Sequence, residues 1–401
     1  MKLPARMCAA AVFCWAAAAR GDEPRFERVV VDDAFPGAYQ VEAVDVNGDG
    51  KVDIVAVGGG TCAWYENPRW TKRIVTSPSI TPGIISSATA DLDGDGRAEV
   101  AIGYDFEMNE PKRGKLLIAR QGQTLEEPWQ VQKIGDVPSV HRLRWVPAAK
   151  GRRPSRLVVA PIFGSEAVPP SFQDAPAKIQ IFEQVVGIGA ATFWSGIDIG
   201  GRLVTHSVEV HANPVEPVEG LPLILTADNE GVALLKAGTR RDIRFDVRPL
   251  IPGLAGTAPK RGSSEVHLGK LSDGRRFLAT IDPWHGSQVA VCLEKKLGAW
   301  EFESRVVLDE SLDDGHALCV VDVDRDGNDE VVAGHRGKDH RVSIYRLSAS
   351  SGGWQRTVLD RGVAAQDVRP GDVDGDGAAD FVAVGGSTHN VVLYRNLAGR
   401  R

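Results

Sequence analysis

Four short stretches of this sequence carry acidic side chains at alternating positions, next to a glycine and closed by a further acid. Each follows the pattern D-x-[DN]-x-D-G-x-x-[DE], in which x is any residue. Alternate positions can bring side-chain oxygens to one point, and the glycine permits the sharp turn that an oxygen cage around calcium requires. Without an ion, so many neighbouring carboxylates would repel one another. The sequence therefore predicts up to four calcium ions.

The predicted calcium ligands are Asp45, Asn47, Asp49 and Asp53; Asp91, Asp93, Asp95 and Glu99; Asp322, Asp324, Asp326 and Glu330; and Asp372, Asp374, Asp376 and Asp380. An EF-hand is excluded because the flanking segments have the pattern of strands and the closing acid comes too early.

Histidines form a second candidate site. Seven of the nine fall at two recurring places: before an apolar segment that leads into an acidic loop or its counterpart, and after the next apolar segment. Imidazole is the commonest protein ligand for zinc-like metals and titrates near neutrality. A single such histidine would usually be an ordinary surface side chain, whereas seven favour a common site. These seven are His141, His206, His316, His285, His335, His340 and His389.

The sequence predicts that this site holds a divalent transition metal such as zinc. Our preferred ligands or acid–base groups are His206, His316, His335 and His389, with the other three next. Three carboxylates are further candidates as a ligand, a base or a residue that orients a histidine. They are Asp282, which lies close to His285 in the chain, Glu265 at the entry to a first strand, and Asp228 after a second strand.

The elements that position these residues form a repeat. One unit occurs seven times: a strand, a turn that is acidic and glycine-rich in four copies, a second strand, a third strand and an outer strand. Three weaker copies without the acidic pattern lie in the middle of the chain. Seven such units predict an all-β fold, a seven-bladed β-propeller over residues 22–401.

The last unit is one strand short, and the segment FERVVVDD near the start resembles the outer strands of other units. We therefore expect this N-terminal strand to complete the seventh blade, which leaves no long exposed edge. In each blade the entry to the first strand and the turn after the second strand share one face. The seven histidines should gather at that face, and the acidic loops should lie on the opposite one.

The beginning of the chain predicts export. Lys2 and Arg6 precede an apolar, alanine-rich run, which is typical of a signal peptide and which we assign to residues 1–21. No later segment is long and apolar enough to span a bilayer, so we expect a secreted or periplasmic protein without a membrane anchor. Cleavage after Ala19 would remove Lys2 and Arg6 and change the net charge from −6 to −8, which argues against a nucleic-acid partner. The three remaining cysteines show no disulfide spacing and are expected to be buried.

The acidic loops resemble the FG-GAP/VCBS family of propeller repeats. The strings VHRLRW, THSVEV, RRFLATIDPWHG and DGHALCVVDVDRDGNDEVVAGHRGK are similar to the propeller domain of the aldos-2-ulose dehydratase (anhydrofructose dehydratase) family. The first resemblance implies that the calcium ions are structural. The second implies a divalent metal in a central cleft and removal of water from keto-sugars. The cupin and lectin-like domains of the fungal enzymes have no counterpart here, so an isomerase step is not expected.

These features predict a carbon–oxygen lyase that acts on a small carbohydrate. A metal-polarised ketone acidifies the adjacent C–H, a base removes the proton, and the β-oxygen leaves as water or as a glycosidic alcohol. The alternative is a non-catalytic, calcium-stabilised propeller that binds glycans or proteins at the same face. The sequence leaves the sugar, the leaving group and the oligomeric state open.

Overall fold

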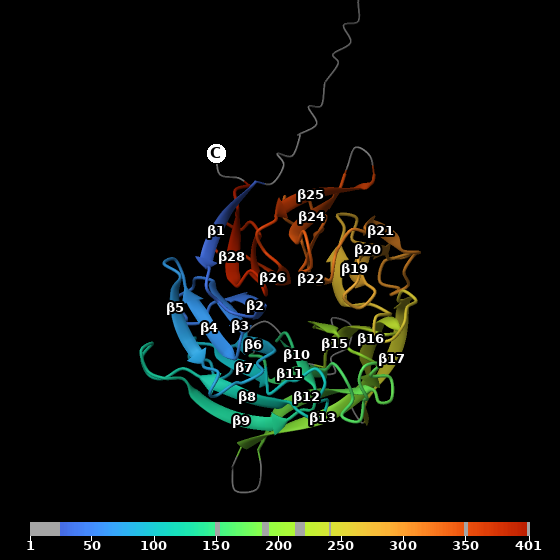
Figure 1. The fold of residues 1–401 in the computed structure, drawn as a ribbon. Helices are drawn as coiled ribbons and strands as arrows, with labels where there is room; N and C mark the ends of the chain where they lie inside the picture. Colours follow the sequence, from blue (N-terminus) through green and yellow to red (C-terminus); the bar gives the residue numbers. More distant parts are fainter. Residues whose placement is uncertain are drawn as a thin grey trace, which may run out of the picture.

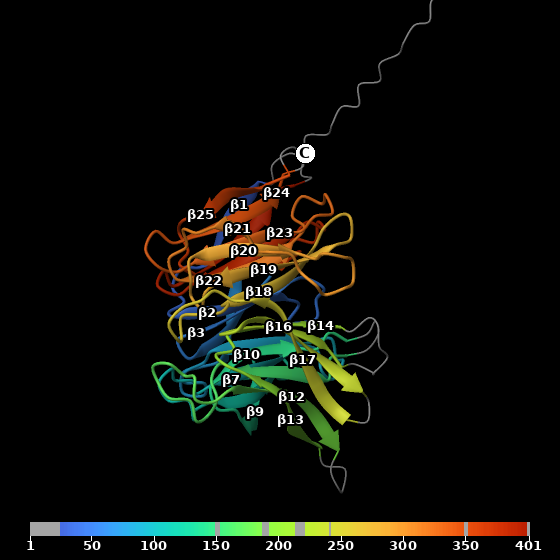
Figure 2. The ribbon, with the colours of Figure 1, turned by 90° about the vertical axis from the view of Figure 1, so that its right-hand side faces the viewer.

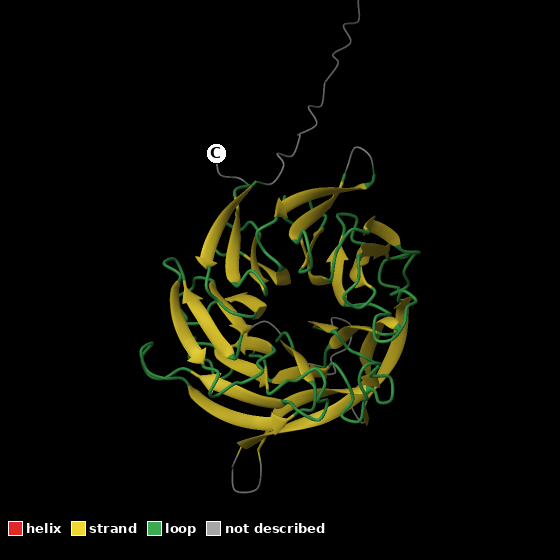
Figure 3. Cartoon of the chain, in the orientation of Figure 1, coloured by secondary structure: helices red, strands yellow, loops and turns green. Residues whose placement is uncertain are grey.

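The described part of the chain forms seven antiparallel sheets of four strands each (Figure 1). The computed structural model describes residues 25–148, 153–186, 192–212, 221–239, 242–348 and 352–398. Within these ranges every regular element is a strand (Figure 3). The predicted all-β, seven-bladed propeller is thus confirmed, while the expected signal peptide lies outside the described residues.

The four strands of a blade are consecutive in the chain, except in the seventh blade. Blade one contains β2 (Ala38–Val44), β3 (Asp53–Gly58), β4 (Thr61–Glu66) and β5 (Thr71–Thr76); blade two contains β6 (Ser86–Ala90), β7 (Glu99–Tyr104), β8 (Lys115–Arg120) and β9 (Gln130–Asp136). Blade three contains β10 (Val140–Trp145), β11 (Arg156–Pro161), β12 (Ala177–Val186) and β13 (Thr192–Arg202); blade four contains β14 (Ser207–His211), β15 (Leu223–Asp228), β16 (Gly231–Thr239) and β17 (Asp242–Pro252). Blade five contains β18 (Glu265–Lys270), β19 (Arg276–Asp282), β20 (Gln288–Leu293) and β21 (Val306–Asp309); blade six contains β22 (Gly315–Val321), β23 (Glu330–His335), β24 (Arg341–Leu347) and β25 (Trp354–Asp360).

The seventh blade joins the two ends of the chain. It contains β26 (Ala365–Gly371), β27 (Asp380–Gly385), β28 (Asn390–Asn396) and, as its outer strand, β1 (Phe26–Asp32). β1 runs antiparallel to β28, with Phe26 opposite Asn396 and Val30 opposite Val392. In Figure 1 the blue β1 lies beside the red β28. The prediction that the N-terminal strand closes the ring is confirmed.

The first strand of each blade lies nearest the axis. Figure 1 shows β2, β6, β10, β22 and β26 around the centre, with β5, β9, β13, β17 and β25 at the periphery. Seen from the side in Figure 2, neighbouring blades lie face to face. Second strands such as β3, β23 and β27 are buried along their whole length because a blade covers each of their faces. The outer strand β9 is mostly exposed.

The hydrophobic core is a series of layers between adjacent blades. One layer joins Ala317 and Val332 of blade six to Val368 and Phe381 of blade seven. The three cysteines expected to be buried, Cys62, Cys292 and Cys319, are free thiols inside such layers. Across the described ranges, no helix is long and apolar enough to cross a membrane.

Candidate functional site

The four acidic loops share one architecture, because each connects the first and second strands of its blade. The closing acid is buried and accepts a hydrogen bond from the backbone N–H of the second loop residue, at 2.8–3.0 Å in all four loops. The first aspartate accepts one from the glycine N–H five residues later, at 2.9–3.2 Å. That glycine has φ between 81° and 89° in every loop, a conformation that side chains other than glycine adopt with strain.

Three loops bring three acids together. Ligand oxygens of the first, third and ninth positions lie within 4.8 Å of one another in the groups Asp91, Asp93 and Glu99; Asp322, Asp324 and Glu330; and Asp372, Asp374 and Asp380. The fifth-position acids Asp49, Asp95, Asp326 and Asp376 do not belong to such a group. Asp49 and Asp95 instead pair with Lys51 and Arg97, at 2.9 and 2.8 Å. In the first loop Asn47 occupies the third position.

The electrostatics of these loops favour a bound cation. Burial, followed by the charges of Asp324, Asp326 and Asp322, raises the pKa of Glu330 to about 8. Burial and neighbouring carboxylates likewise raise the pKa values of Asp53 and Asp380 to about 6. Oxygen-only ligands on a glycine-containing turn suit a hard cation such as calcium, which would relieve this repulsion.

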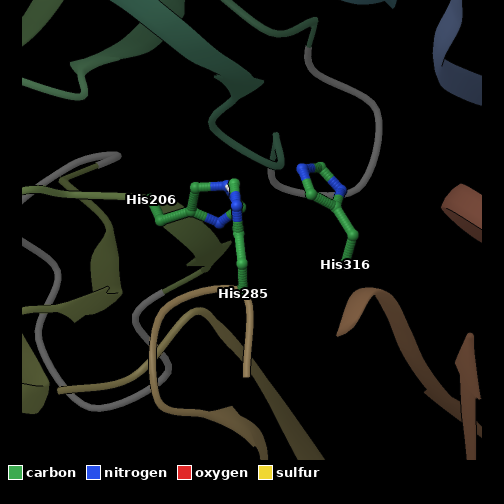
Figure 4. A group of neighbouring side chains, drawn as sticks. All are labelled: His206, His285 and His316. Atoms are coloured by element: carbon green, nitrogen blue, oxygen red, sulfur yellow. Dashed lines mark hydrogen bonds between the residues drawn. The ribbon is translucent and has the colours of Figure 1, made fainter. Parts of the chain in front are cut away.

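Histidines converge near the axis at the other end of the first strands. His206, His285 and His316 place one ring nitrogen each within 4.8 Å of one another (Figure 4). They come from the segment before β14, the turn between β19 and β20, and β22, in blades four, five and six. His141 of β10 lies beside them, with its ring centroid 4.9 Å from that of His206.

Contacts outside the cluster orient two of these rings toward a common centre. His206 Nδ1 lies 3.0 Å from the Ser264 carbonyl and 3.0 Å from Glu265 Oε1. His316 Nδ1 lies 2.6 Å from the Gln366 carbonyl. The Nε2 atoms of both rings are therefore left for the shared centre, as in metal sites where an outer partner fixes each histidine.

The third ring belongs to His285, whose Nδ1 lies 3.0 Å from Arg336 Nη2 and 3.4 Å from Asp314 Oδ1. Its Nε2 lies 3.0 Å from His206 Nε2. Two nitrogens on one tetrahedral zinc ion are about 3.3 Å apart, given Zn–N bonds of about 2.0–2.1 Å. His285 has φ 50°, an uncommon conformation that the surrounding contacts must maintain.

Burial keeps these imidazoles neutral. It is the main cause that lowers the pKa values of His206, His285 and His316, and the charges of neighbouring Arg142 and Arg336 add to the effect. A neutral ring has one lone pair to offer, and in His206 and His316 it lies on Nε2. In His285 Nδ1 accepts from Arg336, so this ring would bind a divalent transition metal through Nε2 with Asp314, rather than Arg336, as the partner of Nδ1. The residues present thus fit the kind of metal that the sequence predicts.

A tyrosine adjoins the cluster. The Tyr39 hydroxyl, from β2 of blade one, lies 2.9 Å from His141 Nε2 and 3.4 Å from His316 Nε2. Arg142 Nη1 lies 3.1 Å from His141 Nε2 and its guanidinium carbon 5.5 Å from the centre of the Tyr39 ring. Since Arg142 can only donate, His141 Nε2 is the acceptor, and Tyr39 can donate to it as well.

Access to the cluster is limited. His141, His206 and His316 are at most 2% exposed, whereas the His285 side chain is 12% and the Asp314 side chain 37% exposed. A small molecule would therefore approach from the side of His285 and Asp314. Trp284 is buried against His206 and His285, with ring centroids 6.1 and 4.5 Å away, so it packs the site.

Other predicted site residues lie apart from this cluster. His335 Nδ1 contacts the Asp313 carbonyl at 3.1 Å, His340 precedes β24, and the exposed His389 accepts a hydrogen bond from the Gly37 N–H at 3.3 Å. The buried Asp282 side chain contacts Arg305 and Thr280. Burial raises its pKa despite the charge of Arg305.

Two residues that we did not single out as site candidates, Tyr39 and Arg142, contact the cluster, and Glu265 supports it. A repeat position could have revealed Tyr39. His141, His206 and His316 stand six residues before the first loop position of their blades, and Tyr39 and the predicted candidate Glu265 occupy the same position in blades one and five. The sequence prediction rested on imidazole and carboxylate side chains and so did not include the tyrosine.

Comparisons with known proteins agree with this architecture. Residues 45–102 and 322–383 match the family model described as FG-GAP-like repeat. Residues 117–296 match the model of the aldos-2-ulose dehydratase beta-propeller domain, and this segment includes His141, His206 and His285. A search of curated proteins finds no match.

Solved structures share the fold at low identity. A chain of Kuenenia stuttgartiensis hydrazine synthase is 14% identical, with 91% of this chain and 97% of that chain covered and a TM-score of 0.54. A chain of the mitotic checkpoint complex is 13% identical, with 97% and 99% covered and a TM-score of 0.52. The protein is a seven-bladed β-propeller with FG-GAP-like repeats, related over residues 117–296 to the propeller domain of aldos-2-ulose dehydratase.

Proposed function

We propose that this protein is an exported, metal-dependent carbon–oxygen lyase that eliminates water or an alcohol from a keto-sugar or keto-glycoside. The observation that carries the proposal is the convergence of His206, His285 and His316 from three blades, beside a tyrosine–histidine pair. The relation to the aldos-2-ulose dehydratase propeller over residues 117–296 supports the same substrate class. The partner is a small carbohydrate, with no nucleic acid and no membrane anchor involved.

His206, His285 and His316 would hold the divalent metal, for which zinc is our first candidate. A bound divalent ion supplies Lewis acidity that polarises a ketone oxygen. Calcium would occupy the acidic loops on the opposite face in a structural role. The two kinds of site differ in ligand chemistry, imidazole nitrogen against carboxylate oxygen, so the same metal is not expected to satisfy both.

Proton transfer falls to Tyr39 and His141. The Tyr39 hydroxyl donates toward His141 Nε2, 2.9 Å away, and can accept a proton from the carbon next to the ketone as its own proton moves to the imidazole. Arg142 would stabilise the negative charge that develops on the tyrosine oxygen, while burial and Arg142 lower the pKa of His141. The proton can return by the same route to the departing β-oxygen.

The decisive experiment combines a metal assay with a reaction assay. Purified protein is treated mildly with a chelator, analysed for bound metal, and incubated with 1,5-anhydrofructose or glucosone while ultraviolet absorbance reports an enone product. We expect turnover to require a metal other than calcium. His285→Ala should lower turnover at least ~100-fold and release that metal. His389→Ala, whose imidazole is exposed and outside the cluster, is the matched control.

Tyr39→Phe separates chemistry from metal binding. It should lower turnover by about 10²–10⁴-fold, the range that general acid–base catalysis supplies, while the metal content stays at the parent level. Tyr104→Phe controls for loss of a phenolic hydroxyl elsewhere. If parent-level turnover persists in both His285→Ala and Tyr39→Phe, or if no metal supports elimination, the lyase proposal is wrong.

The burial of three of the four histidines favours a second candidate, a non-catalytic propeller that binds glycans or proteins. In that case the cluster would be a structural site. Chelation at neutral pH would then remove only calcium, glycan binding would survive His285→Ala, and keto-sugars would be recovered unchanged.

A further inference from the structure

A pocket of about 310 Å³ lies in the central channel, at the end opposite to the histidine cluster. Blades one, two, three and seven line it. The polar and aromatic side chains at its wall are Gln40, Glu42, Thr89, Arg144, Trp145 and Arg369. Trp145 is the last residue of β10 and His141 the second, which separates the two sites by about 13 Å along the strand at about 3.3 Å per residue.

The hydrogen-bond acceptors of this pocket are already in use. Glu42 Oε1 accepts from the Ser87 hydroxyl at 2.5 Å, and Glu42 Oε2 accepts from the Thr89 N–H at 2.9 Å. Gln40 Oε1 accepts from the Ser86 hydroxyl at 2.6 Å, and its amide nitrogen donates to the Ser87 carbonyl at 2.9 Å. The pocket therefore offers a ligand few acceptors.

Donors, in contrast, are in surplus. A guanidinium has five N–H donors and no acceptor. Arg144 donates to the Leu143 carbonyl at 2.8 Å and forms no ion pair with a carboxylate of the described residues. Arg142, two residues earlier on the same strand, faces Glu265 at 3.5 Å. Arg369 donates through Nε to Asp367 at 3.2 Å, which leaves its terminal N–H groups available.

The charge of Arg144 is only partly balanced where it lies. Burial and the neighbouring charge of Arg369 lower the pKa of Arg144 to about 9 against the opposite effect of the Asp367 and Glu42 carboxylates, so the side chain stays cationic at neutral pH. An unpaired charge inside a protein is costly, and a guanidinium matches the planar or tetrahedral oxygens of an anion. The pocket therefore offers free N–H donors and the positive charge of Arg144. A ligand with hydrogen-bond acceptors and a negative charge would match both.

We propose that this pocket binds a small oxyanion, with a carboxylate, sulfate or phosphate group held by Arg144 and Arg369. The site is separate from the histidine cluster and does not depend on any reaction there. The pocket volume of about 310 Å³ is near the lower limit of ligand pockets. It can hold a free inorganic anion or a sugar acid of one ring.

The test uses the full chain in chloride buffer at constant ionic strength. Phosphate, sulfate, acetate and glucuronate are added separately, with glucose as the neutral control, and binding is measured by calorimetry and by the shift in Tm. We expect saturable binding of at least one anion and none of glucose. If phosphate or sulfate binds better than acetate, the ligand is an inorganic anion or a phosphate ester. If only glucuronate binds, the ligand is a sugar acid.

Two variants from different blades locate the site. Arg144→Gln and Arg369→Gln should each weaken anion binding at least ~10-fold. Arg144→Gln should also raise Tm in anion-free buffer, because it removes a charge that is only partly balanced. Arg275→Gln, whose side chain pairs with Asp273 on the surface, is the control and should bind as the parent does. The proposal is overturned if no anion binds, or if both pocket variants bind with parent affinity. Either result leaves the elimination assay unaffected.

Discussion

At the scale of single residues, Glu265 connects the histidine cluster to its surroundings. Burial alone would raise its pKa, but the hydrogen bond with His206 and the charge of Arg142 outweigh burial and lower the pKa to about 2. The carboxylate is therefore ionised and lies 3.0 Å from His206 Nδ1. That nitrogen also contacts the Ser264 carbonyl at 3.0 Å, which leaves Nε2 of the ring as the lone-pair nitrogen. Glu265 is a positioning residue for a ligand.

We predict that Glu265→Gln lowers the affinity of the cluster for zinc by about 10–100-fold, as is usual for loss of an outer-shell partner. Competition with a coloured chelator measures this affinity. Glu209→Gln is the matched control, because Glu209 is a part-buried carboxylate that also lies beside histidines but is outside the cluster. Equal zinc affinity of the two variants would contradict the assigned role of Glu265.

The surroundings of Glu209 predict that the thermal stability of the protein depends on pH. Its carboxylate lies 3.1 Å from His211 Nε2 and 3.3 Å from His267 Nδ1. Burial opposes ionisation, but the two histidines lower the pKa of Glu209 to about 2, and Glu209 raises the pKa of His211 against the effect of burial. The lowered pKa gives stability that is present above about pH 4.3 and lost as the pH falls toward 2. The raised pKa gives stability that is present below about pH 6.5 and lost as the pH rises through the folded value.

The difference in Tm between the parent and Glu209→Gln should therefore be largest between about pH 4.5 and 6.5 and decrease on both sides. Thermal unfolding from pH 3 to 9 measures it. Glu310→Gln, at a surface position, should show no such maximum. A difference that is constant across this pH range would exclude the proposed coupling.

At the scale of elements, β1 closes the ring. Its partly buried residues Val29 and Val31 pack against the core layer between blades one and seven, and Arg28 pairs with Asp360 at 2.7 Å. Deletion of residues 26–32 should expose the edge of β28, lower Tm and cause aggregation, because an unpaired strand edge invites pairing with other chains. Light scattering during thermal unfolding reports both effects.

Point variants on β1 separate the effect of losing core packing from the effect of introducing a charge at a solvent-facing position. Val29→Asp places a charge against the core layer and should lower Tm by several degrees, since burial of an unpaired charge is strongly unfavourable. Val30→Asp is the matched control, because Val30 faces solvent and is 47% exposed. If both variants had the same Tm as the parent, the packing of β1 would contribute little to closing the ring of blades.

At the scale of the whole molecule, the acidic loops contribute through ions that bind the folded state. Excess chelator should lower Tm, since an ion present at 100 times its Kd stabilises the folded state by about 2.7 kcal/mol. Asp324→Ala should lower Tm in calcium and reduce the further loss on chelation. Asp273→Ala, in the corresponding turn of blade five without the acidic pattern, is the control. Unchanged melting of the parent with a calcium chelator would contradict a structural role for the ions.

Features that repeat, or that are local in the chain, can be predicted from the amino-acid sequence of this protein. Seven units, the short last unit and the strand at residues 26–32 predict a closed seven-bladed ring, because sheet pairing follows the strand pattern and an open edge must be covered. The acidic loops were predictable for the same reason: their ligands lie within nine residues, so a short turn alone brings them together.

Which histidines meet depends on how the blades pack around the axis. All seven predicted positions share one face, but the entries to the first strands surround the axis, whereas the turns after the second strands start one strand farther out. His141, His206 and His316 therefore converge, while His335, His340 and His389 do not. His285 joins them from a turn after a second strand, with its ring centroid 4.8 Å from that of His206. The pocket with Arg144 and Arg369 has the same origin, since these residues are 225 positions apart and meet only when blade seven closes beside blade one. Distances across the axis depend on how all seven blades pack, and no local pattern in the chain encodes them.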